Sequence, residues 1–467
     1  MGLAWMLWVL VSLLSVSFTG EHPFLALVTG GLGGCGVGVS LSRQLRRQKA
    51  SKVSPGNSSR WVCGIQRYEL FLLSPFLLVL LFSNRLPLKL TFLPLAFFLF
   101  LLICRKRVTG RFFAVTPFHL PILLLLLSSG VGLYASVDLP LSARDVLQLV
   151  AGVAVCYGIA NHVDSERKVE VAHFLFLAVG ATLAFGAMLV MQQPNAKLPL
   201  VERIFSLFPN PFPRRIHSNY VGGALTLFLP IAFWCLIFRY KGRVLWPVLA
   251  FAITGIGLVL TQSRGALLGT VVALAITGAL ERRWVRWLLL MLMVGFGLLI
   301  YRVGIGAILG PVGTGGLEHT WEGRQELWNR ALYIIQDFPF TGIGMHTFPV
   351  VTDMLYPLFL LGPNARVPHA HNLYLQVAVD IGIPGFVAFW MLLGAWGGMM
   401  WETLKKTDPG SGAHRFRPLA LGLVGGMLAH LLYSVTDTIA LGEKAGVIFW
   451  AVLGMSTAVW NKVREEE

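Results

Sequence analysis

Charged side chains are scarce in this chain, and acidic ones are scarcer than basic ones. Only 13% of its 467 residues are charged, with 22 Asp and Glu against 38 Lys and Arg, whereas 55% are hydrophobic. A soluble domain cannot bury so much apolar surface, so this composition predicts a protein that crosses the membrane many times. The formal charge of +16 does not indicate nucleic-acid binding, because the basic residues stand in short clusters between apolar spans.

Cysteine is also rare, and several common sequence signals are missing. None of the five cysteines falls in a loop that we place outside the membrane, which excludes a disulfide framework. No basic segment precedes the apolar residues 3–19 and no small-x-small cleavage site follows them, so we expect an uncleaved first helix. The glycine-rich residues 30–38 lack the strand and the acidic residue that accompany a dinucleotide-binding loop, and they predict close helix packing instead.

Fourteen apolar stretches have the length of a membrane span. If both ends of the chain lie on the inner side, 25 of the 38 Lys and Arg fall in the seven inner loops, and the long segment 302–372 lies outside. We therefore expect an all-α, polytopic membrane protein with about 12–14 transmembrane helices. Its parts are an N-terminal bundle (1–301), a long, partly helical outer loop (302–372) and C-terminal helices (373–467). The fourteen stretches are residues 3–19, 24–41, 68–83, 88–104, 117–135, 146–160, 171–191, 217–238, 244–261, 265–280, 287–301, 373–400, 418–436 and 445–461.

Two arginines stand where an anion could be held on the outer side. The outer loop predicts a helix from Trp321 to Gln336, and Arg324 falls in the middle of its apolar face. Arg324 either binds an anionic ligand there or has a structural role, in which it snorkels or pairs with a carboxylate. Arg264 begins a span at the outer interface, where it binds a ligand or anchors to lipid headgroups. Two guanidinium groups at one outer mouth suit a pyrophosphate. The apolar face comprises Trp321, Trp328, Ala331, Leu332 and Ile335.

Histidines and one carboxylate mark the start of the span at 373–400. His371 is suited to act as a general base near neutral pH, although an interfacial histidine packed for structure is the simpler interpretation. Asp380 falls on another stripe of the same helix and should not orient it. His369 and His371 form a possible metal pair, but they lack a clear carboxylate ligand, so we expect no metal. Asp437, at the outer end of a later span, either pairs with an arginine or takes part in catalysis.

Four motifs follow one another in a distinctive order. They are Ser263-Arg-Gly265, Gly323-Arg324 followed by Leu327-Trp328, Phe340-Thr-Gly-Ile-Gly-Met-His-Thr-Phe348 and His371-Asn-Leu-Tyr-Leu-Gln376. Together they resemble the O-antigen ligase and polymerase superfamily of bacterial envelope enzymes. His217-Ser-Asn219, at the start of a span, is similar to a further element of that superfamily.

The resemblance implies a fold like that of the class C glycosyltransferases, which take a glycan from undecaprenyl pyrophosphate without a nucleotide sugar, a cofactor or a metal. Carried over by motif, Arg264 and Arg324 bind the donor pyrophosphate, with Arg215 as a third contact, and His371 is the general base. The resemblance places the protein in the bacterial inner membrane among membrane lipids, with its site facing the periplasm. The supporting residues expected are His217, Asn219, His369, Asn372, Tyr374 and Asp437.

The acceptor distinguishes the members of this superfamily. A ligase transfers O-antigen to lipid A–core, a polymerase joins repeat units, and a relative glycosylates protein. We favour the ligase because the long loop lies late in the chain. A carrier of a small anion such as bicarbonate is the alternative of another class, but we find no internal inverted repeat, and the distinctive residues gather on one side of the membrane. A cell-wall glycan polymerase with Asp353 or Asp437 as its catalytic carboxylate is a further alternative.

Overall fold

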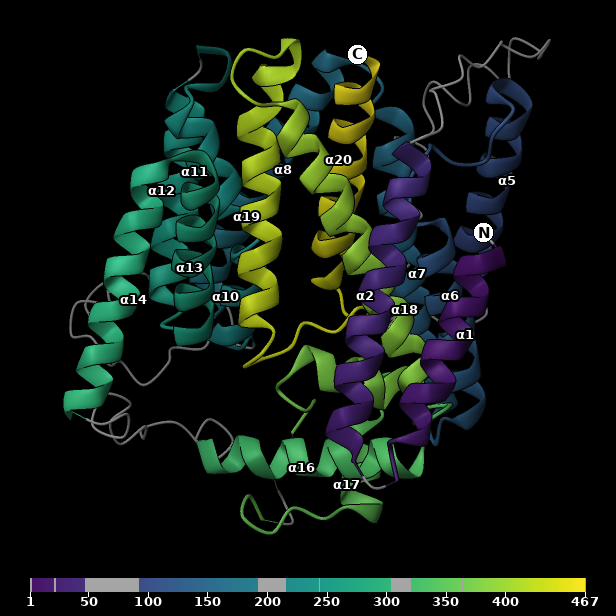
Figure 1. Ribbon diagram of the computed structural model, residues 1–467. Helices are drawn as coiled ribbons and strands as arrows, with labels where there is room; N and C mark the ends of the chain where they lie inside the picture. The colour runs from purple at the N-terminus through teal and green to yellow at the C-terminus, as the bar shows by residue number, and fades with distance from the viewer. Residues whose placement is uncertain are drawn as a thin grey trace.

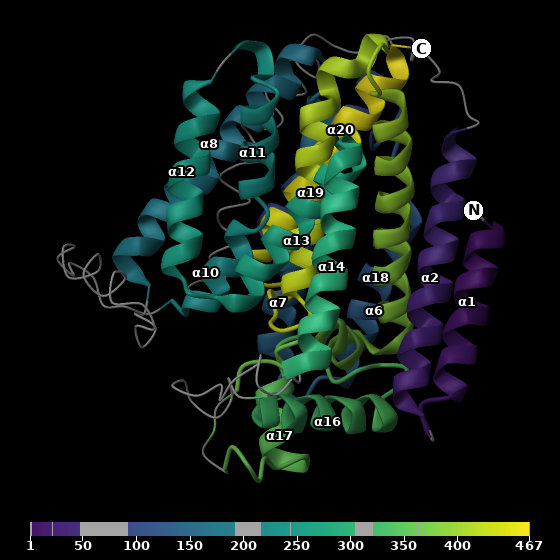
Figure 2. The ribbon, with the colours of Figure 1, turned by 60° about the vertical axis from the view of Figure 1, so that its left-hand side comes forward.

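The protein is a bundle of helices. The computed structural model describes residues 2–20, 22–46, 92–191, 216–242, 244–303, 321–362, 365 and 367–466, and within these ranges it contains helices and no β-strand (Figures 1 and 2). Eight spans in the described part of the chain are long and apolar enough to cross a membrane. The predicted class, an all-α multi-pass membrane protein, is confirmed.

The helices keep the order that the apolar stretches predict, and most begin or end within a few residues of them. Of the fourteen stretches, residues 68–83 lie outside the described part of the chain. The helices are α1 (Gly2–Ser17), α2 (Pro23–Arg46), α5 (Phe92–Thr109), α6 (His119–Ala135), α7 (Leu139–His162), α8 (Glu166–Val190), α10 (Ser218–Leu225), α11 (Leu229–Ile237), α12 (Leu245–Leu260), α13 (Arg264–Glu281), α14 (Arg283–Val303), α16 (Trp321–Asp337), α17 (Phe348–Leu355), α18 (Leu373–Lys406), α19 (Arg417–Tyr433) and α20 (Gly446–Glu465).

Two predicted spans differ from the structure for physical reasons. The stretch 217–238 is not one helix but two, α10 and α11, because Pro230 in the first turn of α11 has no N–H to continue a helix from α10. The stretch 88–104 continues as α5 to Thr109, through basic residues that we assigned to a loop. Arg105 is tolerated in the helix because its guanidinium reaches the Asn161 carbonyl oxygen, 3.4 Å away.

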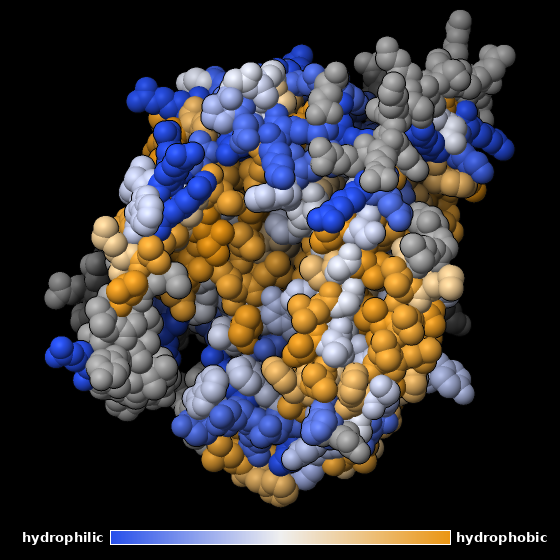
Figure 3. Space-filling model, viewed as in Figure 1, coloured by the Kyte–Doolittle hydropathy of each residue, from blue (hydrophilic) through white to orange (hydrophobic). Residues whose placement is uncertain are grey.

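The helices connect two polar ends across an apolar band (Figure 3). At the upper end in Figure 1, Arg417 of α19 contacts Glu281 of α13, with 2.7 Å between Nε and Oε2. At the lower end, His371 lies just before α18 and contacts Asp437, which follows α19. We name these ends the Arg417 face and the His371 face.

Helix α16 lies crosswise beyond the His371 face, with α17 next to it (Figures 1 and 2). Its bounds, Trp321–Asp337, confirm the helix predicted there. The predicted apolar face is wrong at Trp321, whose side chain is 55% exposed, because the buried side is centred on Gly323, Leu327 and Ala331, and Trp321 lies away from it. On the opposite side Glu326 accepts hydrogen bonds from the backbone N–H groups of Leu360 and Leu361, and so holds the chain after α17 against α16. The buried residues of α16 are Gly323, Leu327, Ala331, Ile334 and Ile335.

The motif Phe340–Phe348 fills a break in α18. Around Gly382, with φ at +68°, the helix opens and leaves backbone groups without helical partners. The N–H groups of Ile343 and Gly344 donate to the carbonyl oxygens of Val379 (2.9 Å) and Asp380 (3.1 Å). A Cβ on Gly342 would lie 2.6 Å from the Asp380 backbone. The motif's glycines thus permit a loop to enter the bundle and to hydrogen-bond the backbone carbonyl groups at the break in the helix.

The glycine-rich residues 30–38 lie in α2, where it packs along α18. A Cβ on Gly34 would lie 2.5 Å from the Val387 carbonyl oxygen, and one on Gly38 would lie 2.0 Å from that of Met391. This contact confirms the prediction of close helix packing.

Candidate functional site

His371 is held at a fixed point where α18 begins against the end of α19. Asn372 caps α18: its Oδ1 accepts from the Leu375 N–H (3.0 Å), and its amide donates to the Val435 carbonyl oxygen (3.0 Å). His371 itself has φ at +48°, a left-handed conformation that a residue with a side chain rarely adopts. Such strain is typical of positions that the surrounding structure fixes for function.

His371 and Asp437 form a buried pair. Their Nδ1 and Oδ1 atoms are 3.0 Å apart, and the side chains are 7% and 6% exposed. The Thr438 N–H donates to the same Oδ1 at 2.8 Å. Burial raises the pKa of Asp437, but the hydrogen bond from His371 and the charge of the imidazole outweigh burial and hold the pKa below its usual value. An ionised Asp437 accepts from Nδ1–H, which makes Nε2 of His371 the nitrogen that can take up a proton.

His369 supports this pair from the loop before it. Its Nδ1 accepts from the backbone N–H of His371 (3.2 Å), and its Nε2 lies 4.0 Å from Oδ1 of Asp437. Burial, with the nearby charge of His371, lowers the pKa of His369 to about 3. His369 is therefore a neutral imidazole whose remaining proton, on Nε2, is directed to the carboxylate.

The same three side chains have the donor set of a metal site. The ligand atoms of His369, His371 and Asp437 all lie within 4.8 Å of one another. The sequence alone did not identify the carboxylate of this donor set, because Asp437 is 66 residues from His371 and on another element. Two histidines and one carboxylate suit a transition metal. These donors already hydrogen-bond one another, however, so a metal would have to replace the bond between His371 and Asp437.

Arg324 reaches the site from α16 and has an unsatisfied donor. Among the described residues, its buried Nε has no hydrogen-bond partner and no carboxylate lies within ion-pair distance of its guanidinium. Burial lowers the pKa of Arg324, the charge of Asp437 raises it, and the charge of Arg264 lowers it. The two arginines and Asp437 are therefore close enough to interact electrostatically on one face. Asp437 pairs with His371 rather than with an arginine.

Arg264 is the first residue of α13, after a strained turn. Gln262, two residues earlier, has φ at +52°. The Arg264 side chain is exposed, in contrast to the buried Ser263 before it. A Cβ on Gly265 would lie 2.4 Å from Oγ1 of Thr436, so the start of α13 packs directly against the chain that carries Asp437.

Helix α10 completes the surroundings of the pair. His217 caps α10 by accepting from the Asn219 N–H (3.3 Å), and it is near enough to His369 to lower that group's pKa. The Tyr433 hydroxyl donates to the Asn219 carbonyl oxygen (2.9 Å) and thereby joins α10 to α19. The two predicted residues, His217 and Asn219, therefore lie beside the site. Asn219 has a structural role there, because its carbonyl oxygen connects α10 to Tyr433.

The remaining predicted residues have other positions. Tyr374 donates its hydroxyl hydrogen to the Leu431 carbonyl oxygen (2.8 Å) and stacks on Trp390, so it holds α18 against its neighbours. Arg215 lies outside the described residues. Asp353 is exposed on α17. Asp380 accepts from Gln376 at 2.7 Å and does not contact His371, as its position on another stripe of α18 predicts. The carboxylate beside His371 is Asp437, a pairing that we did not predict.

A second cluster of titratable side chains, which sequence reasoning missed, lies on the same face; its His346 side chain is 39% exposed. His346 contacts Asp145 of α7, with 3.1 Å between Nδ1 and Oδ2, and this hydrogen bond raises the pKa of His346 to about 9. Burial, and after it the charge of Asp145, raise the pKa of Glu443 to about 8. The available signals were an acidic residue within an apolar span, at Asp145, and the histidine in the motif Phe340–Phe348.

Comparison with known families adds an independent finding. Residues 248–390 match the family model described as O-antigen ligase. This segment contains Arg264, Arg324 and His371 and ends before Asp437. No curated protein matches the chain. The match confirms the resemblance that the motifs indicate and supports the transfer of a lipid-linked glycan as the general activity: this multi-pass membrane protein carries, at residues 248–390, a domain of the O-antigen ligase superfamily.

Proposed function

We propose that this protein transfers a glycan from undecaprenyl pyrophosphate to a hydroxyl group of lipid A–core, at the periplasmic face of a bacterial inner membrane. One observation carries the proposal: a buried His371–Asp437 pair shares a face with Arg324, whose Nε has no partner among the described residues. A base and an unsatisfied cation side by side suit a reaction in which an alcohol loses a proton and a phosphate leaves.

His371 is the general base in this proposal. As the acceptor oxygen attacks the anomeric carbon, its proton passes to Nε2 of His371, while Nδ1–H keeps its hydrogen bond to Asp437. Asp437 stabilises the imidazolium that forms, because its carboxylate is ionised and within 3.0 Å. His369 stays neutral and does not compete for the proton.

Arg324 and Arg264 act on the leaving group. When the bond between the anomeric carbon and the pyrophosphate oxygen breaks, the pyrophosphate takes the electron pair and gains negative charge. Guanidinium groups donate paired hydrogen bonds to phosphate oxygens, so the buried Nε of Arg324 would find its partner there. The exposed Arg264 would take the outer part of the same pyrophosphate.

The position of the site favours transfer over transport. A carrier holds its substrate near the middle of the bilayer between broken helices, whereas His371 and Asp437 lie at the end of the bundle next to α16, the helix that carries Arg324. The Arg417 face carries the basic loops and is therefore assigned to the cytoplasm, which leaves the His371 face to the periplasm.

A transfer assay with three acceptors tests the proposal. Purified protein receives an undecaprenyl-pyrophosphate glycan together with lipid A–core, a second lipid-linked repeat unit or an acceptor protein, each with and without EDTA. We expect product on lipid A–core at the same rate in both conditions. Product on the repeat unit or on the protein would instead identify a polymerase or a protein glycosyltransferase.

The assay also separates a wrong mechanism from a wrong function. Loss of activity in EDTA, with recovery on adding Zn²⁺, would make His369, His371 and Asp437 a metal site and overturn the role of His371 as a base. If folded protein transfers glycan to none of the acceptors, but proteoliposomes take up bicarbonate, the carrier is the correct assignment.

A further inference from the structure

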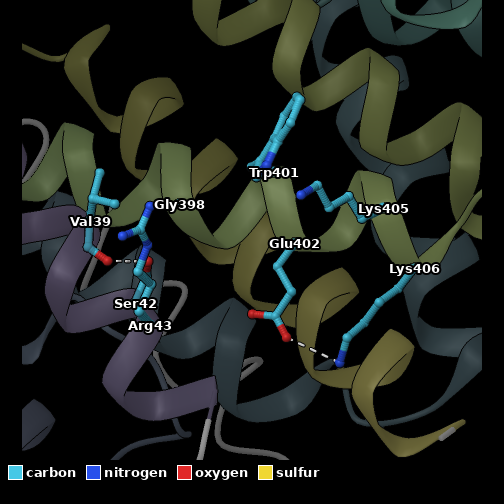
Figure 4. Close-up of a pocket in the computed structure, with 8 residues that line it drawn as sticks. All are labelled: Val39, Ser42, Arg43, Gly398, Trp401, Glu402, Lys405 and Lys406. Carbon is cyan, nitrogen blue, oxygen red and sulfur yellow. Dashed lines mark hydrogen bonds and ion pairs between the residues drawn. The ribbon is translucent and has the colours of Figure 1, made fainter.

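A basic groove lies on the Arg417 face, at the opposite end of the bundle from the proposed active site. It forms between the last turns of α2 and α18 and has a volume of about 320 Å³. Arg43 extends from α2 on one side, and Glu402, Lys405 and Lys406 extend from α18 on the other (Figure 4). The lining residues are Val39, Ser42, Arg43, Gly398, Trp401, Glu402, Lys405 and Lys406.

The groove has an excess of positive charge that the described residues do not neutralise. Its one acid, Glu402, already contacts Lys406 at 3.0 Å and accepts from the indole N–H of Trp460 at 3.1 Å. Within the described part of the chain, no carboxylate lies within ion-pair distance of Arg43 or Lys405. These two cations, unlike the other basic residues joined by ion pairs on this face, remain available for an anion.

The exposure and the position of Trp401 indicate the source of that anion. Its side chain is 53% exposed, and the Lys405 ammonium lies 5.1 Å from its ring centroid. An exposed tryptophan beside lysine and arginine at the end of a membrane helix is typical of the headgroup level of a bilayer. Val39 gives the groove an apolar wall on the α2 side. The chemistry therefore suits a ligand with a phosphate head and a hydrocarbon tail.

We propose that this groove binds the phosphate headgroup of an anionic membrane lipid in the leaflet at the Arg417 face. Arg43 donates paired hydrogen bonds to the phosphate oxygens, and Lys405 contributes a second positive charge. The lipid tail lies along the outer side of α2. The close glycine contacts between α2 and α18 continue to Gly398, where a Cβ would lie 2.1 Å from Oγ of Ser42, so the bound lipid lies over the last turns of the two helices, where this packing ends.

Native mass spectrometry of the purified full-length protein tests this site. Retention of phosphatidylglycerol is compared with that of phosphatidylcholine for the wild type, Arg43→Gln/Lys405→Gln and the conservative variant Arg43→Lys. The matched control, Arg239→Gln/Arg282→Gln, also removes two exposed positive charges from the Arg417 face, but away from the groove. We expect phosphatidylglycerol affinity to fall on the order of tenfold in the groove variant and to stay unchanged in the control.

Three results would overturn the proposal. Equal retention in the wild type and the groove variant would show that the groove is not the site. An equal loss in the control would show that total charge, not the groove, attracts the lipid. Displacement of phosphatidylglycerol by millimolar inorganic phosphate would identify a free anion as the occupant. Arg43→Lys keeps the charge but not the paired hydrogen bonds, so it should retain more lipid than Arg43→Gln/Lys405→Gln and less than the wild type. Thermal unfolding of each variant separates a loss of binding from misfolding.

Discussion

The two polar faces of the bundle use arginine in opposite ways. On the Arg417 face, Arg417 is 6% exposed and fully engaged: it donates to Glu281 (2.7 Å), to Asp408 (2.6 Å) and to the Leu404 carbonyl oxygen (2.8 Å). On the His371 face, the buried Nε of Arg324 has no hydrogen-bond partner among the described residues. A buried donor without a partner costs free energy, so its presence points to a ligand that the isolated chain does not supply.

The carboxylates of the two faces differ in the same way as the arginines do. Glu166 on the Arg417 face is shared by Lys241 and Arg415 and so connects three segments of the bundle. On the His371 face, one oxygen of Asp437 is paired with His371, and the other is buried without a hydrogen-bond partner in the described part of the chain. Apart from the groove cations Arg43 and Lys405, these charged groups of the Arg417 face serve assembly, whereas Arg324 and Asp437 on the His371 face keep unsatisfied atoms for chemistry.

The largest expected difference between the faces is in the transfer rate after one histidine on each face is replaced by alanine. His371→Ala should lower the transfer rate by about 10²–10⁴, because the acceptor proton loses its base. His414→Ala removes an imidazole on the Arg417 face that contacts the Thr407 carbonyl oxygen and the Phe238 ring, and it should leave the rate unchanged. Single-turnover rates with the lipid-linked donor measure both. Undiminished transfer in His371→Ala would remove the general base from the mechanism.

The arginines should separate activity from stability. Arg324→Met should lower the transfer rate on the order of 10²–10³, because the leaving pyrophosphate loses a donor, while stability stays equal or rises. Arg417→Met should instead destabilise the protein by about 3–5 kcal/mol, because it leaves Glu281 buried and unpaired. Thermal unfolding and transfer rates on the same samples check this pair. A stability loss in Arg324→Met as large as that in Arg417→Met would make Arg324 a structural residue.

The carboxylate beside His371 should have a smaller effect than the arginine or the base. Asp437→Asn keeps the size of the side chain but does not hold Nδ1–H or stabilise the imidazolium, so we expect transfer to fall on the order of 10². The pH dependence of the rate is the decisive readout, since the loss of an orienting carboxylate should change it, whereas the loss of a packing contact should not. A matched change on the other face, Asp408→Asn, should leave the rate and its pH profile as in the wild type.

Sequence reasoning found the elements of the site but not their pairing. Periodicity placed Arg324 on the inward side of α16, and hydropathy placed His371 at the start of α18, because both signals are local. The bond between His371 and Asp437 depends on how α18 meets the end of α19, which no repeat in the sequence encodes. The break in α18 was missed for the same reason: its backbone partners come from a loop about forty residues earlier.

The smallest expected effect is a pH dependence of stability that belongs to the His371 face alone. His346 has its pKa raised from 6.5 to about 9 by Asp145, and burial raises that of Glu443 from 4.5 to about 8. A group whose pKa rises on folding stabilises the protein fully below its unfolded pKa and loses that contribution as the pH rises through the folded value. Both contributions therefore decline in the same direction, for Glu443 between pH 4.5 and 8 and for His346 between pH 6.5 and 9.

We accordingly expect the melting temperature to fall as the pH rises from 6.5 to 9, measured by thermal unfolding in detergent. His346→Gln should flatten the upper part of that decline, between pH 8 and 9, because its neutral amide has no proton to lose. The control His414→Gln, on the Arg417 face, should follow the wild-type curve. A decline that persists unchanged in His346→Gln would assign the pH dependence to other groups, and the His346–Asp145 contact would then be only a packing feature, like the ion pairs of the opposite face.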